Sequence, residues 1–143
     1  MDTVDARLLQ EFPRLRNSAF SVSSPEASSY NCIAWAIGSD NTWWSPIDMY
    51  YWPPNCPRKE TTEAYVAAFA AIGFEICDNR EYEVGYQKIA LYIRQSTPTH
   101  AAKQLPNGKW SSKLGSSFDI EHQLEGLEGH HYGKVAMFFR RHV

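Results

Sequence analysis

The sequence predicts an α+β domain in which a short helix, beginning at Cys32, packs on a mainly antiparallel sheet. Residues 28–38 read SSYNCIAWAIG, where serine and asparagine oxygens can cap an apolar run and Gly38 can end the helix. Residues 87–94 form a nearly continuous apolar run, as a central strand does. The pair Asn107-Gly108 lies between two more strand-like runs and is the strongest short hairpin signal.

Length and composition exclude several classes of protein. The chain has 143 residues and a net charge of −2, with no run of lysine and arginine, which argues for one domain and against a nucleic-acid partner. Its three cysteines lack CxxC spacing, so neither a disulfide framework nor a metal site is expected, and no cofactor motif is present. We find no signal-peptide pattern and no apolar run of the ~18–20 residues that cross a membrane. We therefore expect a cytoplasmic protein without a membrane partner.

The remaining elements follow from periodicity and capping residues. An amphipathic lead-in over residues 2–15 and a serine-rich loop to residue 27 precede the Cys32 helix. A second helix is expected from Thr61 or Thr62 to Gly73, followed by a short strand over 74–77. Ser116 and Ser117 are expected to cap a third helix from Phe118 to about Leu127, with Asp119 in its first turn, and residues 135–139 predict a closing strand.

Cys32 is the candidate nucleophile. Unpaired N–H groups in the first turn of a helix, and the positive end of its dipole, favour a thiolate. Neighbouring donors, such as the Asn31 side chain, could then stabilise an oxyanion. The alternative is a buried structural cysteine, because free cysteine is among the most buried residue types.

His100 is the candidate base. With Asn107 and Gly108 as a two-residue turn, Gln104 would face Ser111, and His100 would share one face of the sheet with Ser111 and Lys113. We therefore expect Cys32 Sγ and the His100 ring to lie within about 4 Å, or one water, of each other. Ser111, a backbone carbonyl or Asp119 would orient the imidazole, and Lys113 would hold an anionic group of the substrate or pair with Asp119 or Glu121.

The loop after Gly38 is unusually aromatic. Its rings could seal the core, border a substrate groove beside Cys32, or do both. At least two of the loop aromatics are expected at that groove. The candidate substrate-binding aromatics are Trp35, Trp43, Trp44, Tyr51, Trp52 and Trp110, with Tyr50 as a further loop aromatic.

A helix-start cysteine followed by a histidine on a later strand resembles the papain-like superfamily, which includes the NlpC/P60, CHAP and transglutaminase-like branches. From about Phe12 to Arg141 the chain is also similar to a family of small uncharacterised bacterial proteins, through YNCIAWA (residues 30–36) and THAAKQLPNGKW (residues 99–110). The resemblance implies a single papain-like domain over 1–143, with 1–27 as lead-in. The sequence departs from the superfamily pattern where papain-like enzymes usually carry an orienting Asn or Asp, since it has Ser111, Ser112 and Lys113 there.

These features predict a thiol-dependent hydrolase or transferase that acts on an amide or carboxamide through a Cys32–His100 pair. The substrate would be a protein, a peptide-like molecule or a small amide, and the enzyme a peptidase, amidase or deamidase. One alternative is a non-catalytic binding module of the same fold with an aromatic-lined groove. A second, weaker alternative is a metal held by Cys32, His100 and His122, although no local ligand pair supports it.

Overall fold

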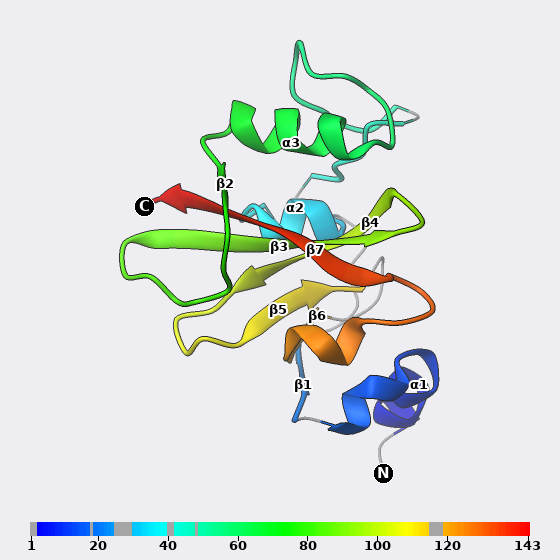
Figure 1. Ribbon diagram of the computed structural model, residues 1–143. Helices are drawn as coiled ribbons and strands as arrows, with labels where there is room; N and C mark the ends of the chain where they lie inside the picture. The colour runs from blue at the N-terminus through cyan, green and yellow to red at the C-terminus, as the bar shows by residue number, and fades with distance from the viewer. Residues whose placement is uncertain (1–2, 18, 25–29, 40–41, 48, 115–118) are drawn as a thin grey trace.

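The structure combines a few short helices with one large sheet (Figure 1). It is a computed structural model that describes residues 3–17, 19–24, 30–39, 42–47, 49–114 and 119–143. The helices are α1 (Thr3–Glu11), α2 (Cys32–Ala36) and α3 (Thr62–Ala71), with the 3₁₀ helices η1 (Pro13–Asn17) and η2 (Leu124–Leu127).

Seven strands form the sheet, in the order β1-β6-β5-β4-β3-β7-β2. Every neighbouring pair is antiparallel, which confirms the predicted α+β class with an antiparallel sheet. The strands are β1 (Ser21–Ser24), β2 (Glu75–Cys77), β3 (Tyr86–Arg94), β4 (Thr97–Gln104), β5 (Trp110–Lys113), β6 (Asp119–His122) and β7 (Lys134–His142).

The sheet separates two hydrophobic clusters. Along β3, Ile89 and Leu91 belong to one cluster and Ala90 and Tyr92 to the other, as the alternation of a buried strand requires. The first cluster includes residues of α2 and α3, and we call this side of the sheet the α2 face. The second includes residues of α1, η1 and η2, and we call this side the α1 face.

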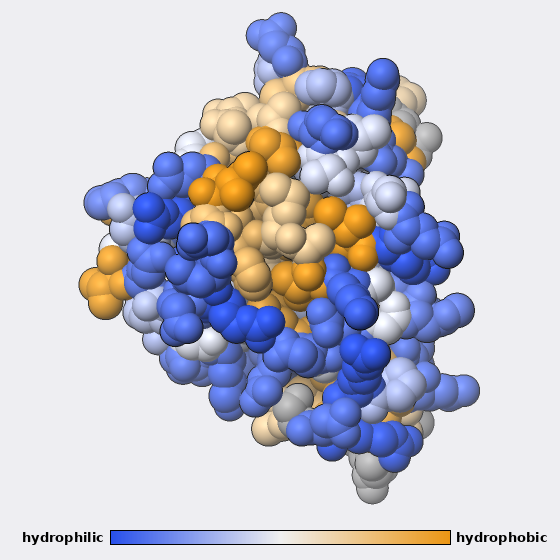
Figure 2. All heavy atoms as spheres, in the orientation of Figure 1, coloured by the Kyte–Doolittle hydropathy of each residue, from blue (hydrophilic) through white to orange (hydrophobic). Residues whose placement is uncertain are grey.

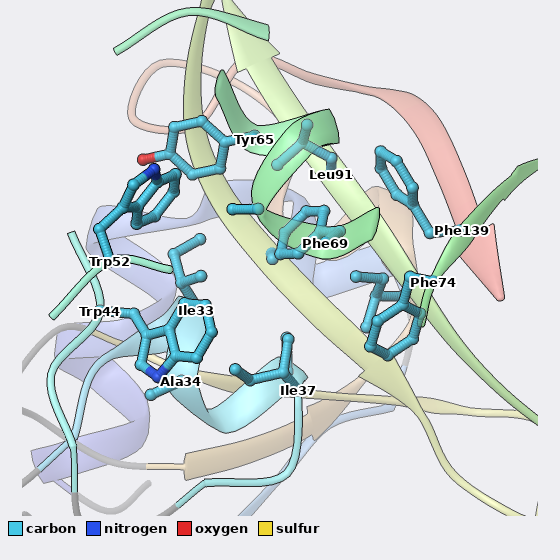
Figure 3. Packing of buried hydrophobic residues seen from close by; sticks show 14 of the residues in the cluster. Ile33, Ala34, Ile37, Trp44, Trp52, Tyr65, Phe69, Phe74, Leu91 and Phe139 are labelled. Carbon is cyan, nitrogen blue, oxygen red and sulfur yellow. The ribbon is translucent and has the colours of Figure 1, made fainter. Parts of the chain in front are cut away.

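The α2 face carries the larger aromatic core (Figure 3). α3 begins at the predicted cap, since the Thr61 side chain accepts a hydrogen bond from the Ala64 N–H. Phe69 of α3 packs its ring edge-on against Phe139 of β7, with centroids 5.0 Å apart. Trp52 bridges α3 and the loop, because its ring meets Tyr65 at 5.1 Å.

The predicted third helix is wrong at its start. Asp119–His122 form β6, which pairs with both β5 and β1. The four residues alternate across the sheet, with Ile120 in the α1-face cluster and Asp119 bonded to Tyr30 of the α2-face cluster. Only Leu124–Leu127 is helical, as a 3₁₀ turn. Ser116, Ser117 and Phe118 lie outside the described residues.

The hairpin forms at the predicted place with a different register. Gln104 pairs with Trp110, and Lys103 with Ser111. The turn is longer than two residues, because Gly108 N–H donates to Leu105 O and Leu105 N–H to Lys109 O. Gly108 has φ = +86°, as expected in a turn with an added left-handed residue. This one-residue shift exchanges the faces of every side chain on one strand relative to the other.

The surface shows hydrophobic residues gathered on one side. In the orientation of Figure 1 they lie across the middle of the molecule, between α3 and β7, and hydrophilic residues surround them (Figure 2). In the described part of the chain, no helix is long and apolar enough to cross a membrane.

Candidate functional site

Cys32 is the first residue of α2, at the junction of that helix with β4 and β5. It is partly exposed. Burial raises the pKa of its thiol to about 11, although the backbone N–H groups of Ala101, Ile33 and Cys32 itself and the positive charge of Lys113 act in the opposite direction. The thiol is therefore protonated at neutral pH, which differs from the thiolate expected from sequence. With five residues, α2 is too short for its dipole to offset the burial.

His100 lies on the other face of the sheet from Cys32. Its register partner is Tyr92 of the α1-face cluster, whereas the next residue, Ala101, belongs to the α2-face cluster that Cys32 packs against. The predicted Cys32–His100 pair is therefore not formed. The cause is that α2 packs on the face of β4 that carries Ala101, and the hairpin register puts Ser112 rather than Ser111 on the His100 side.

A chain of hydrogen bonds determines which ring nitrogen of His100 carries the proton. His122 Nδ1 lies 2.8 Å from the Gln123 carbonyl, which only accepts, so this nitrogen carries the proton. Ser112 then donates to His122 Nε2 at 2.7 Å and accepts from His100 Nε2 at 2.9 Å. All three side chains are fully buried. His122 falls within the helix predicted from Phe118 to about Leu127, and nothing in the sequence indicates this role.

Both imidazoles of this chain are neutral. Burial lowers the pKa of His122 to about 4, and burial and the neighbouring His122 lower the pKa of His100 well below its ordinary value. The His100 ring also stacks on Tyr132, with centroids 4.1 Å apart and planes 8° apart. His100 is thus a structural residue of the α1 face.

Lys113 and Asp119 lie on the α2 face with Cys32. They are register partners on β5 and β6, and both are fully buried. Tyr30, in the segment that leads into Cys32, donates from its hydroxyl to Asp119 Oδ2 at 2.7 Å, and Lys113 Nζ lies 5.1 Å from the centre of the Tyr30 ring. Asp119 Oδ1 is buried and has no hydrogen-bond partner among the described residues.

Ser111 and Trp35 complete this face of the site. Trp35 Nε1 donates to Ser111 Oγ at 3.0 Å, so Ser111 holds the tryptophan, and it is Ser112 that bonds to His100. The Trp35 ring stacks on Tyr30 at 5.5 Å and receives Lys103 Nζ at 3.6 Å from its centre. Sequence reasoning missed Tyr30 and Lys103, although Tyr30 stands in the same motif as Cys32.

Asn31 has a different role from the predicted oxyanion donor. Its Oδ1 accepts from the N–H groups of Ala34 and Trp44, and its Nδ2 donates to Trp44 O. The side chain is buried. Asn31 therefore caps α2 and fastens the aromatic loop to it.

Replacing Asn31 by Ala is expected to lower the free energy of unfolding by about 2 kcal/mol or more, since a cap is lost and Trp44 backbone groups lose their partners. Thr61→Ala, which removes one cap bond from α3, is the matched control and should cost about 1 kcal/mol. Urea denaturation measures both. Equal losses would show that the bonds to Trp44 add nothing.

The aromatic loop divides between core and surface. Trp44 and Trp52 are buried in the α2-face cluster, and their rings point into it (Figure 3). Tyr50 and Tyr51 are 45% and 46% exposed, and Trp43, which is half-buried, packs against Tyr50. The core role is confirmed for Trp44 and Trp52, so the prediction that these two residues bind substrate is wrong.

Trp110 is buried in the α1-face cluster, so the sheet lies between Trp110 and Cys32. It lines a surface hollow of about 330 Å³ together with Arg80, Lys109 and Gln123. It therefore does not share a substrate groove with Cys32. The same separation prevents Cys32, His100 and His122 from holding one metal, and no group of three His, Cys, Asp or Glu residues in the described part could do so.

Fold and site together define an α+β domain with a cysteine-bearing helix and a buried lysine–aspartate pair on one face of an antiparallel sheet. The chain belongs to the family described as a domain of unknown function (DUF7689), whose model matches residues 21–140. Searches of curated proteins and of solved structures found no significant match.

Proposed function

We propose that the chain is a thiol-dependent hydrolase or transferase of amides that acts through Cys32, with Lys113 and Asp119 in place of the predicted histidine. The observation that carries the proposal is the setting of the sulfur. Cys32 is partly exposed, backbone N–H groups of three residues act on its sulfur, and the Lys113 charge lowers its pKa. N–H groups and a cation are what a tetrahedral oxyanion requires.

The burial of charge supports a functional site here. A fully buried lysine and a fully buried aspartate each carry a desolvation cost of several kcal/mol that a purely structural core avoids. Both stand on the face of the partly exposed thiol. Groups that a fold keeps at such cost beside a nucleophile are candidates for chemistry.

The reaction would proceed in two steps. The Cys32 thiolate, whose formation the positive charge of Lys113 favours, attacks the acyl carbon while the N–H groups hold the oxyanion. The C–N bond then breaks, the Lys113 ammonium gives a proton to the leaving nitrogen, and a Cys32 thioester remains. Water or an amine attacks the thioester, returns a proton to Lys113 and releases the Cys32 thiolate. Peptide-like molecules and small amides fit this scheme.

A papain-like relationship remains part of this proposal. A helix that begins at cysteine and packs on the β4–β5 hairpin supports it. His100 facing away from the cysteine is the main departure, and Lys113 on the neighbouring strand would take its place.

Mass spectrometry after incubation with p-nitrophenyl acetate at pH 9 tests the thiol. We expect an acetyl adduct on Cys32 in the intact protein, at least tenfold faster than on Cys77, and loss of that adduct in Cys32→Ala. Lys113→Met should slow acylation at least tenfold. Cys77→Ala is the matched control, because it removes a partly exposed thiol on the far face. Equal acylation of Cys32 and Cys77 would contradict the proposal.

The second candidate is a binding module, which the exposed part of the aromatic loop favours. Met49 is completely exposed and Ile47 is 42% exposed, beside the half-exposed Tyr50 and Tyr51. Apolar side chains that gather on a surface commonly mark an interaction site. Absence of any Cys32-dependent acylation would leave this as the better function.

A further inference from the structure

We infer that Asp119 Oδ1 is a specificity group that accepts the N–H of the scissile amide, so that the site selects primary and secondary amides over esters and N-substituted tertiary amides. This inference rests on the proposed function of Cys32. It starts from the buried carboxylate oxygen that has no partner among the described residues.

The two oxygens of Asp119 have different surroundings. Oδ2 accepts the Tyr30 hydroxyl at 2.7 Å, which fixes the orientation of the carboxylate. Oδ1 shares the same burial but lacks a donor among the described residues. A buried acceptor without a donor is costly, and a ligand that supplies an N–H relieves that cost.

The position of Asp119 suits a contact with the leaving nitrogen. Its register partner is Lys113, whose charge acts on the Cys32 thiol, and its hydrogen-bond partner Tyr30 leads into Cys32. Asp119 is thus linked to the thiol through two residues of the same face. A carbonyl held beside the sulfur would therefore have its leaving nitrogen on the face of the sheet that carries this carboxylate.

The chemistry of the acceptor decides the class of substrate. A carboxylate oxygen accepts a hydrogen bond from an amide N–H, and neither an ester oxygen nor an N-methylated nitrogen can supply one. A site built to hydrogen-bond an N–H discriminates strongly against analogues that lack it, because its own polar group is then left unpaired. Substrates with at least one N–H on the scissile nitrogen are therefore favoured.

Three acetyl donors separate this inference from the proposed function: p-nitroacetanilide, its N-methyl derivative and p-nitrophenyl acetate. For the intact chain we expect Cys32-dependent cleavage of the anilide at least tenfold faster than of the N-methyl anilide, after correction for their uncatalysed rates. Asp119→Asn should lower the anilide rate about tenfold or more and change acylation by the ester less than twofold.

The outcomes are distinguishable. Loss of ester acylation in the intact chain overturns the proposed function itself. Equal rates for the two anilides, or an equal fall of ester and anilide rates in a folded Asp119→Asn protein, overturn the role of Asp119 alone. Glu121→Gln is the matched variant, because Glu121 is also a carboxylate of β6 but contacts Lys109 and Asn107 of the hairpin turn, and it should retain the preference for the N–H. If Asp119→Asn does not fold by circular dichroism, the comparison of the two anilides in the intact chain still decides.

Discussion

Lowering the pH from 6.5 to 4 is expected to remove about 3 kcal/mol from the free energy of unfolding through His122 alone. In the folded state burial holds the pKa of His122 at about 4, whereas the unfolded chain takes up the proton near 6.5. Protonation therefore favours the unfolded state throughout this window, and stability falls as the pH falls. His100, whose pKa is also lowered, adds to the effect.

The hydrogen-bond chain explains why neither imidazole accepts the proton readily. His122 Nε2 accepts from Ser112, whose Oγ accepts from His100 Nε2, so a proton on His122 Nε2 takes away the acceptor of the Ser112 hydroxyl proton. Glu121 and Glu125 raise the pKa of His122 only in part, and the aromatic neighbours of His100 are Tyr92 and Tyr132. No described acid is hydrogen-bonded to either ring to stabilise an imidazolium.

Urea denaturation at half-unit pH steps, with NMR of the imidazole nitrogens, measures this effect. His122→Gln keeps one donor and one acceptor but cannot be protonated, so its pH dependence should be shallower by about one proton. The exposed His130→Gln is the matched control and should keep the full slope. A His122 that titrates near 6.5 in the folded protein would refute the expectation.

Much of the framework was predictable because its signals are local. The Asn31 cap, the Thr61 cap and the apolar run of β3 each depend on a few neighbouring residues, and the structure confirms all three. The predicted amphipathic lead-in covers part of the core, because its apolar residues are buried on the α1 face: Leu8, Leu9, Phe12 and Leu15.

The site was harder to predict because it depends on register. Asn107-Gly108 correctly marked the hairpin, but the same dipeptide is compatible with a two-residue turn or a longer one with Gly108 left-handed. The difference of one residue moves Ser111 and Lys113 to the face opposite His100. The polar residues on both faces of both strands do not distinguish the two turns, but Pro106 favours the longer one, because it has no N–H to donate to Lys109 across a two-residue turn.

Strand β6 shows a second reason why local sequence signals did not predict the site. The segment from Asp119 to Leu127 has acidic residues near its start and leucines at helical spacing, which favours a helix by local criteria. Pairing with two neighbouring strands overrides this preference for Asp119–His122. The error concealed His122 as the end of the buried chain, whereas Asp119, one of the two expected partners of Lys113, is its register partner.

The largest change expected from the site concerns alkylation of Cys32. At pH 7 a thiol of pKa about 11 is a thiolate in about one molecule in 10,000. Because the thiolate is the reactive form, the rate with iodoacetamide should rise about tenfold for each pH unit from 7 to 10 and level off only near 11. A Cys56→Ser/Cys77→Ser background leaves Cys32 as the remaining thiol, so that mass spectrometry reports its rate directly.

Lys113 gives this prediction its sharpest test. Its positive charge lowers the pKa of the thiol, so Lys113→Met should raise that pKa further and slow alkylation at pH 9. Lys109→Met is the matched control, because Lys109 is exposed on the turn of the same hairpin, and its removal should leave the rate unchanged. A plateau of the alkylation rate at or below pH 9, in the protein that keeps Lys113, would mean that burial does not set the pKa of the Cys32 thiol. An unchanged rate in Lys113→Met would remove the lysine from the chemistry of this face, and with it the proposed proton donor.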